Sequence, residues 1–349
     1  MDSAAQKYAS LLDNAVGLRD EEKPTRKPRR KKRQRAACPL TSFLQSPAWI
    51  AAATEQIVAD ARARGHILEA DVTSEEIRHN NRTARDAAGQ ALDMQVPPAD
   101  TLSCADNEVA TVRSHSGFQC LIPVGACPRV GEVQQALSRE QGPFDIILAD
   151  PPWDNRSARR KNSYVSLARH RYEELLLGLP LARLGSDGGP PRLVAVWCTH
   201  NASQLEFVVK QLLPAWGAPF LAVWYWVKVT RRGVPVRPIG GAHKQPVEYL
   251  VLGGTMADIP DHRVLVSVPS SIHSHKFPLT ELLKPWIGEQ PRCLELFARY
   301  LVPKWTSIGD EVLKFQRLEL YEEVEDTASR EGQVAKHQVA VATCRFQGC

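Results

Sequence analysis

The sequence predicts an α/β fold with a mainly parallel sheet, preceded by a helical segment and a basic arm. From about residue 107 onward, short runs rich in β-branched and aromatic residues alternate with helical patterns. This alternation is typical of a sheet covered by helices on both faces. Most of the runs are apolar at successive positions, as expected for strands buried on both faces. These two observations predict a doubly wound α/β domain.

The predicted arm, residues 1–45, contains the strongest charge cluster of the chain. Nine of the thirteen residues from Lys23 to Arg35 are basic. Because like charges repel one another, we expect a disordered arm that serves as a nuclear-targeting signal or contacts nucleic acid; a solvated tail without a role is the alternative. Without these nine residues the chain has 35 basic against 39 acidic residues, so its body is slightly acidic. We expect a nuclear protein, with the cytoplasm as a second compartment.

Residues 46–105 form the predicted helical segment. Ser46-Pro47 has the form of a helix N-cap followed by a proline in the first turn, and apolar residues then recur at helical spacing as far as Leu68. A second helix is expected from Ser74, with acidic residues in its first turn, to the stop at Pro97-Pro98. Two such helices bury too little surface alone, so we expect them to pack on the α/β domain.

The α/β domain is expected over residues 106–317, followed by a C-terminal tail over residues 318–349. The predicted strands are Val109–Val112, Phe118–Ile122, Phe144–Ala149, Leu193–Cys198, Phe220–Val227, Val247–Leu252, Arg263–Val268, Arg292–Phe297 and Glu311–Phe315. The predicted helices are Val133–Arg139, Tyr172–Leu177, Ser203–Leu213 and Leu279–Ile287. Ligands of open α/β sheets bind at the carboxyl ends of the strands, so chemistry is expected in the loops after Ala149, Cys198, Val227 and Phe297.

Composition and spacing exclude several classes of protein. The 43% hydrophobic and 24% charged fractions rule out collagen-like, mucin-like and wholly disordered chains. The longest apolar stretch, Pro219–Val227, is too short to cross a bilayer, and the first ten residues lack the pattern of a secretory signal. Eight cysteines show no metal-binding spacing, and only His273 and His275 come near it. We therefore expect a soluble protein with reduced thiols, no membrane contact and no metal.

Catalysis is predicted at Asp150-Pro151-Pro152-Trp153, directly after an apolar run. The two prolines fix φ twice and remove two N–H donors, so the chain leaves the sheet stiffly with carbonyl groups free to accept. A carboxylate and a proline carbonyl can bind the two hydrogens of an exocyclic amine on a base, and Trp153 offers a stacking surface. An aspartate after a strand can be merely a helix cap, but the whole tetrapeptide is rare at average composition.

These residues resemble the signature of the eukaryotic adenine-N6 methyltransferases, the family that includes the catalytic subunit of the mRNA adenine methyltransferase. The longer segment Asp150–Tyr164 is similar to the branch called methyltransferase-like protein 4. Further segments that fit in order are Trp224–Lys228, His243–Gly253, Ser267–Lys276, Leu294–Arg299 and Pro303–Gly309. The resemblance covers residues 144–316 and implies a Rossmann-like methyltransferase domain that uses S-adenosylmethionine.

The resemblance also implies which side chains hold the cofactor. The expected cofactor contacts are Asp150, His275, Lys276, Glu295, Arg299, Asp310 and Glu311. Lys276 would bind the methionine carboxylate, and Asp150 would lie near the ammonium group. The alternatives are a surface lysine at position 276 and a structural ion pair between Glu295 and Arg299.

The chain departs from the family pattern at two places. Asp310 stands where the family usually has asparagine, and an aspartate can accept hydrogen bonds from ribose hydroxyls but cannot donate. Near Cys120–Val124 the family's aspartate contact to the cofactor has no counterpart. Both changes affect the expected cofactor site, whereas the catalytic tetrapeptide is intact.

Basic residues around the predicted catalytic corner favour a nucleic acid as substrate. Such charges would bind phosphates, although a solvated loop is the alternative. The expected nucleic-acid contacts are Arg156, Arg159, Arg160, Lys161, Tyr164, Lys228, His243, Lys244 and Glu248.

The predicted reaction is direct transfer of a methyl group from S-adenosylmethionine to the N6 amine of adenosine in RNA. Resemblance to the branch implies small nuclear RNA at an internal 2′-O-methyladenosine. Adenine in DNA is the competing substrate. An inactive RNA-binding scaffold of the same fold and a small-molecule amine methyltransferase are the alternatives of other classes. The chain acts either as a monomer or with a protein partner that the sequence does not identify.

Overall fold

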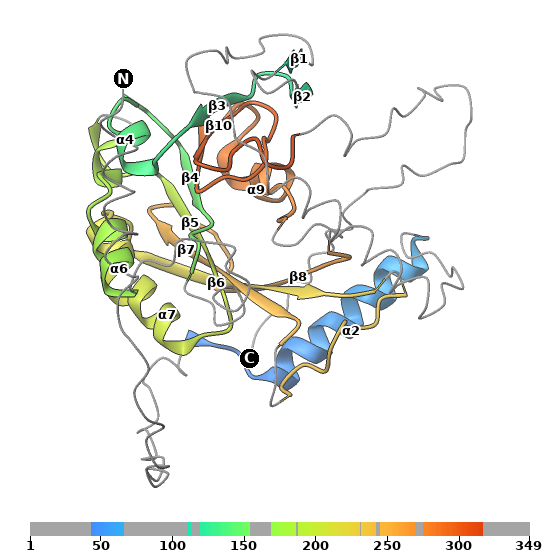
Figure 1. Cartoon of the computed structure of the whole chain (residues 1–349). Coiled ribbons are helices and arrows are strands. Elements are labelled where there is room, and N and C mark those ends of the chain that lie inside the picture. The colour runs from blue at the N-terminus through green and yellow to red at the C-terminus, as the bar shows by residue number, and fades with distance from the viewer. Residues whose placement is uncertain are drawn as a thin grey trace, which may run out of the picture. The chain divides into compact units, whose positions relative to one another are not determined.

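An eight-stranded sheet forms the centre of the structure (Figure 1). The computed structural model describes residues 43–65, 110–113, 119–153, 169–185, 188–230, 232–241, 245–269 and 275–316. All of them belong to one compact unit, Pro39–Cys349. The predicted arm, the predicted second helix from Ser74 and the predicted tail lie outside the described residues.

The strand order of the sheet is β3-β10-β9-β4-β5-β7-β6-β8. The strands are β3 (Cys127–Val130), β4 (Ile146–Ala149), β5 (Leu193–Cys198), β6 (Phe220–Lys228), β7 (Val247–Gly254), β8 (His262–Ser267), β9 (Cys293–Leu296) and β10 (Trp305–Gly309). Neighbouring strands from β3 to β5 are parallel, as are β6 and β8, whereas β7 is antiparallel to both of its neighbours. The mainly parallel sheet is confirmed. A separate antiparallel pair consists of β1 (Ala110–Arg113) and β2 (Gln119–Ile122).

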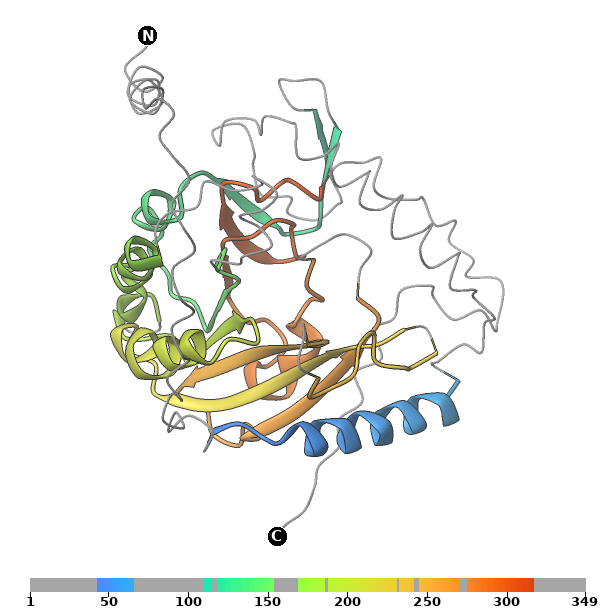
Figure 2. The ribbon, with the colours of Figure 1, turned by 60° about the horizontal axis from the view of Figure 1, so that its bottom comes forward.

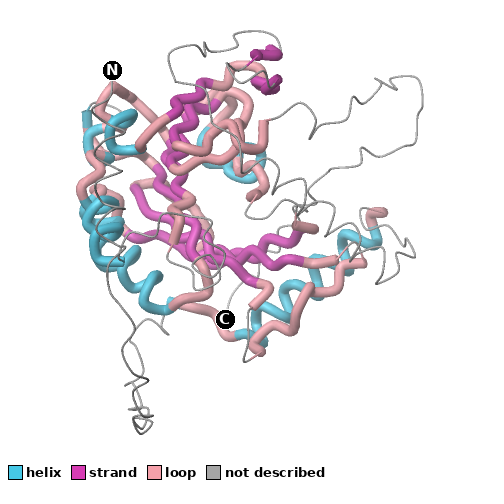
Figure 3. Tube along the Cα trace, viewed as in Figure 1, coloured by secondary structure: helices cyan, strands magenta, loops and turns pink. Residues whose placement is uncertain are grey.

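Helices cover both faces of this sheet. The helices are α2 (Pro47–Ala63), α4 (Val133–Leu137), α6 (Arg169–Leu177), α7 (Ala202–Phe207), a π-helical turn (Val208–Leu212), α8 (Leu213–Ala215) and α9 (Thr280–Ile287), with a 3₁₀ turn at Leu181–Arg183. Buried side chains of α2, α4, α6 and α7 pack on one face, which we call the four-helix face, and those of α9 pack on the other, the α9 face. Accordingly, α9 lies apart from α4, α6 and α7 (Figure 3).

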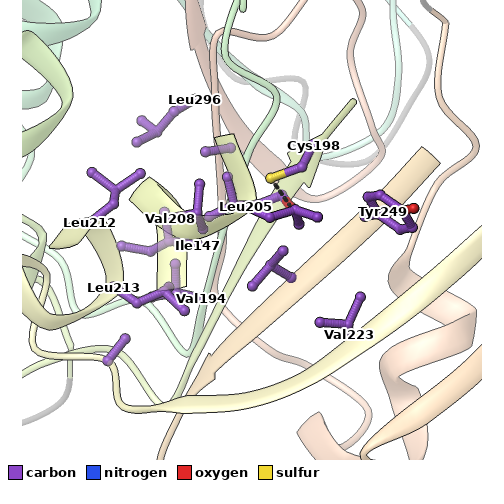
Figure 4. Close-up of a cluster of buried hydrophobic side chains, with 14 of the residues drawn as sticks. Ile147, Val194, Cys198, Leu205, Val208, Leu212, Leu213, Val223, Tyr249 and Leu296 are labelled. Atoms are coloured by element: carbon purple, nitrogen blue, oxygen red, sulfur yellow. Dashed lines mark hydrogen bonds between the residues drawn. The ribbon is translucent and has the colours of Figure 1, made fainter. Parts of the chain in front are cut away.

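The apolar runs of the sequence become the centre of the sheet because β4 and β5 are buried at every position. Successive residues of a strand point to opposite faces, so a strand covered on both sides must be apolar throughout. On the four-helix face, Ile147, Val194 and Leu296 from three neighbouring strands meet the buried side chains of α7 and the π-helical turn (Figure 4).

Helix α2 packs on this domain, as the sequence predicts. The Ser46 hydroxyl accepts a hydrogen bond from the Trp49 N–H at 3.1 Å, and Pro47 occupies the first turn. Trp49 packs edge-on against Tyr225 of β6, with ring centroids 5.9 Å apart. The helix runs alongside the edge strand β8 (Figure 2).

The strand predictions are wrong at three places near the β3 edge of the sheet. Residues 311–315 form turns, and β3 and β10 were not predicted. The β10 sequence contains the polar pair Thr306-Ser307, which does not indicate a buried strand. The strand is buried because it lies between β3 and β9. Strand β3 contains Pro128, which an edge strand tolerates because one side of its backbone is unpaired.

The structure bears on two expectations, those about membrane-spanning helices and about the state of the cysteines. In the described ranges, no helix is long and apolar enough to cross a membrane. Cys120, Cys198 and Cys293 are buried free thiols. Cys127 is disulfide-bonded, so the expectation of reduced thiols is wrong at that position.

Substitution of Ile147 by alanine tests the packing around β4. This side chain is fully buried between β5 and β9, so Ile147→Ala removes apolar contacts and leaves a cavity. The free energy of unfolding, measured by urea denaturation, is expected to fall by about 3 kcal/mol. Val236→Ala, at a site 43% exposed, is the control and should change it by less than about 0.5 kcal/mol. Equal losses in the two variants would contradict the assignment of β4 to the core.

Candidate active site

Asp150 lies at the carboxyl end of β4, inside the parallel part of the sheet. Its N–H donates to the Leu296 carbonyl at the end of β9 at 3.2 Å, so the backbone is still attached to the sheet where the prolines begin. The residue is only 8% exposed. A buried carboxylate needs compensating charge or hydrogen bonds, because transfer of a lone ion from water is unfavourable.

Two cations from other segments supply this compensation. Lys276 Nζ lies 3.2 and 3.1 Å from the two Asp150 carboxylate oxygens, and Arg299 Nη2 lies 3.3 Å from Oδ2. Lys276 precedes α9 and Arg299 follows β9, so the fold brings them together from distant parts of the sequence. Lys276 is 8% exposed, which rules out the surface-lysine alternative.

The double-proline turn is braced by Trp153. The Trp153 N–H donates to the Pro151 carbonyl at 2.7 Å, and its indole N–H donates to the Trp197 carbonyl of β5 at 2.6 Å. The Pro151 carbonyl therefore already accepts one hydrogen bond within the turn. Each carbonyl oxygen has two lone pairs, so one at Pro151 is still able to accept.

A chain of ion pairs connects Asp150 to Lys228 at the end of β6. Lys276 also contacts Glu248 of β7 at 3.3 Å, and Glu248 forms an ion pair with Lys228 of β6. Burial opposes ionisation of Glu248, but Lys276 and Lys228 outweigh it and lower its pKa to about 2. For Lys276, burial acts to lower the pKa, and Asp150 and Glu248 raise it above the ordinary value. Two residues expected to contact nucleic acid, Lys228 and Glu248, thus join the Asp150 cluster.

Beside this cluster, the α9 face of the sheet carries buried polar atoms that have no hydrogen-bond partner in the part of the chain that the structure describes. They are Glu295 Oε2, Ser307 Oγ and Trp197 Nε1. Glu295 of β9 pairs in register with Ser307 of β10, so both side chains lie on the same face. Burial, followed by the charge of Asp150, raises the pKa of Glu295 to about 8, against smaller opposing effects of Arg299 and Lys276. Unpaired buried polar groups of this kind are suited to a polar ligand.

The other expected cofactor residues lie around the same strand ends. The His275 ring packs edge-on against Tyr300, with centroids 4.4 Å apart, and burial and Lys276 lower its pKa to about 4. Asp310 follows β10 and is exposed, but partial loss of hydration, followed by the charges of Glu132 and Glu311, raises its pKa. Glu311 forms an ion pair with Lys314 at 2.5 Å. Because its pKa is lowered to about 4, His275 is neutral at pH 7 and can bind a ligand only as an uncharged ring.

Gly309 allows β10 to approach the loop that carries Arg299. A Cβ atom at this position would lie 2.7 Å from the Ala298 carbonyl oxygen. The Ala298 N–H donates to the Ile308 carbonyl at 3.0 Å, which holds the two segments together. A glycine is required here because no side chain fits.

Sequence reasoning missed two aromatic groups at this site, Tyr172 and Phe297. The Tyr172 ring contacts Trp153 and Phe297, with centroid separations of 6.3 and 6.2 Å. The available signals were Phe297 at the end of the predicted strand Arg292–Phe297 and Tyr172 at the start of the predicted helix Tyr172–Leu177.

The structure does not describe all of the expected site residues. Those that lie outside the described residues are Arg156, Arg159, Arg160, Lys161, Tyr164, His243 and Lys244. Within the part of the chain that the structure describes, no group of three or more histidine, cysteine, aspartate or glutamate side chains could hold a metal ion.

Comparison with known proteins matches residues 144–311 to the MT-A70 family. The chain is 33% identical over 269 residues to the N(6)-adenine-specific methyltransferase METTL4 of Mus musculus, covering 73% of this chain and 50% of the relative. It is 34% identical over 198 residues to the N6-methyladenosine RNA methyltransferase MTA1 of Pyricularia oryzae, covering 54% and 52%. It is 31% identical over 277 residues to the DNA N6-methyl methyltransferase of Caenorhabditis elegans, covering 69% and 73%. The chain spans half the length of the mouse relative.

The pH dependence of stability tests the environment of Glu295. Below its ordinary pKa of 4.5 the carboxyl group is protonated in both the folded and the unfolded chain. Between 4.5 and about 8 only the unfolded chain loses the proton, so rising pH favours unfolding. The free energy of unfolding, relative to the uncharged variant Glu295→Gln, should therefore fall by at most about 1.4 kcal/mol per pH unit.

Urea denaturation of both proteins across this pH range is the measurement. A difference between them that stays constant with pH would show that Glu295 is ionised in the folded chain, contrary to the expectation.

Proposed function

The chain belongs to the MT-A70 family, and on this premise we propose that it transfers a methyl group from S-adenosylmethionine to the N6 amine of adenosine in RNA. The observation that carries the proposal is the Asp150 carboxylate, buried at the carboxyl end of β4 beside the double-proline turn and paired with two cations. This site combines a hydrogen-bond acceptor for an amine with charges for a zwitterionic amino-acid group.

The residues present fit S-adenosylmethionine. Lys276 is the cation that its carboxylate requires, Asp150 is the acceptor for its ammonium group, and Arg299 lies beside both. Glu295 Oε2 and Ser307 Oγ are buried and have no hydrogen-bond partner among the described residues, and ribose hydroxyls are suitable partners for them. When bound, this cofactor supplies a methyl group already activated by a sulfonium charge, so alignment is the main task left to the protein.

The chain's own residues orient the acceptor amine. Asp150 accepts from one amine hydrogen, and the lone pair of the Pro151 carbonyl not used by Trp153 accepts from the other. As the nitrogen forms its new bond it becomes positively charged, and the carboxylate stabilises that charge. The two cations on Asp150 and the two prolines keep these oxygens in place beforehand, so little reorganisation is needed. The extra proton then passes to water.

RNA is the proposed substrate, with adenine in DNA as the second candidate. The resemblance of residues 150–164 to the methyltransferase-like protein 4 branch supports small nuclear RNA, at an internal 2′-O-methyladenosine. The name of the nematode relative, of which the chain covers 73%, supports DNA. The basic run from Lys23 to Arg35 supports a nuclear location for either substrate.

Asp150→Asn tests the catalytic assignment. Asparagine keeps the shape of the side chain but loses the negative charge, so transfer of radiolabelled methyl to RNA should fall at least about a hundredfold. The matched control is Asp258→Asn. Asp258 has φ of 63° in a loop away from Asp150, and asparagine also tolerates that conformation. Full activity of the Asp150 variant would show that this carboxylate is not catalytic.

The choice between RNA and DNA is tested with matched single-stranded oligonucleotides that contain one adenosine. The wild-type chain is expected to show a higher kcat/KM on the RNA, because the proposed site receives an unpaired ribonucleoside. A preference for the DNA would assign the second candidate. Binding of RNA without methyl transfer to either strand would instead support the inactive scaffold.

A further inference from the structure

Tyr172 is the least explained side chain near the catalytic corner. It lies in the first turns of α6, and its ring is in edge-to-face contact with Trp153, at an interplanar angle of 84°. The ring also contacts Phe297, which has φ of 61°, a conformation uncommon for an aromatic residue. Trp153 follows β4 and Phe297 follows β9, so the Tyr172 ring contacts aromatic residues that lie after two neighbouring strands.

The hydroxyl group of Tyr172 is not accounted for by packing. Its oxygen is buried and has no hydrogen-bond partner among the described residues, although the ring itself is only partly buried. Burial and the charge of Asp150 raise the pKa of Tyr172 well above its ordinary value, so the group keeps its proton and is a donor. A phenylalanine would fill the same space without leaving a polar atom unpaired. The hydroxyl is therefore suited to a ligand that brings an acceptor.

The faces of the sheet indicate which ligand this is. Lys276 packs over Trp197 on the α9 face, where Glu295 and Ser307 also lie. Trp153, Tyr172 and Phe297 pack against the four-helix face. The charged and unpaired polar groups suit the amino-acid and ribose parts of the cofactor, whereas aromatic rings suit a base. In a direct transfer, the donor and the acceptor approach the reacting atom from different sides.

We propose that Tyr172 binds the target base. Its hydroxyl donates a hydrogen bond to a ring nitrogen adjacent to the exocyclic amine, and the same amine donates a hydrogen bond to Asp150. This inference rests on the proposed function. In adenine the amine is flanked by the acceptors N1 and N7, so a donor beside Asp150 meets one of them. The Tyr172 hydroxyl then selects a base with an acceptor next to its amine.

The test is Tyr172→Phe in the full-length chain, combined with changes in the substrate. Methyl transfer is measured on three RNA oligonucleotides whose single target is adenosine, 1-deazaadenosine or 7-deazaadenosine. On adenosine, kcat/KM should fall about tenfold to a hundredfold, the loss expected for one buried hydrogen bond. On the analogue that lacks the bonded nitrogen, the variant and the wild type should be equal. Affinity for S-adenosylmethionine, measured by calorimetry, should not change.

Thermal unfolding separates this role from a structural one. Because the hydroxyl is unpaired in the described structure, Tyr172→Phe should melt at the same temperature or higher. The matched control is Tyr225→Phe, whose hydroxyl accepts from the Gln45 N–H at 2.8 Å and contacts His262 Nδ1 at 3.3 Å. That variant should melt lower and should affect the three substrates equally.

Three results would overturn the inference while leaving the proposed function intact: unchanged activity of Tyr172→Phe on adenosine, an equal loss on all three substrates, or a loss that tracks cofactor affinity. Failure of the proposed function gives a different result. In that case the wild-type chain itself transfers no methyl group to the adenosine oligonucleotide, and the inference falls with it.

Discussion

The structure depends on one buried electrostatic arrangement, the Asp150 carboxylate held between Lys276 and Arg299. A carboxylate that is 8% exposed is stable only with close partners, and both partners come from other parts of the chain. Asp150 and Arg299 meet because β4 and β9 are adjacent and parallel, which places the residues after both strands at the same edge of the sheet, and Lys276 comes from the segment between β8 and α9. The Asp150 N–H bonded to Leu296 fixes this register.

The two faces of the sheet present side chains of different chemistry near this carboxylate. The α9 face gathers Lys276, Glu295 and Ser307, which are charged or unpaired polar groups. The four-helix face gathers the rings of Trp153, Tyr172 and Phe297. Burial raises the pKa of Glu295 to about 8, whereas the charges of Asp150 and Glu248 raise the pKa of Lys276 against the opposing effect of burial. A zwitterionic ligand and an aromatic base can therefore approach Asp150 from surfaces of different chemistry.

Most strands could be predicted because a strand buried on both faces has apolar residues at successive positions, as in the run Leu193–Cys198. The strands that were not predicted lack such an apolar run. Strand β10 contains the polar residue Ser307, which is buried because β10 lies between β3 and β9, and β3 tolerates Pro128 because it is an edge strand. Strand β7 reads as a buried strand in sequence, but its antiparallel direction depends on its neighbours.

The sequence by itself determined the α/β class, the Ser46 cap of α2 and the stiff turn from Asp150 to Trp153, because each depends on residues that are close in the chain. Only the tertiary structure decided that Lys276 and Arg299 bind Asp150, that Glu248 joins Lys276, and that the Tyr172 hydroxyl is buried without a partner. These facts depend on which strands are neighbours and on how far water is excluded. Spacing along the chain carries neither, since pairing and desolvation arise only when distant segments pack together.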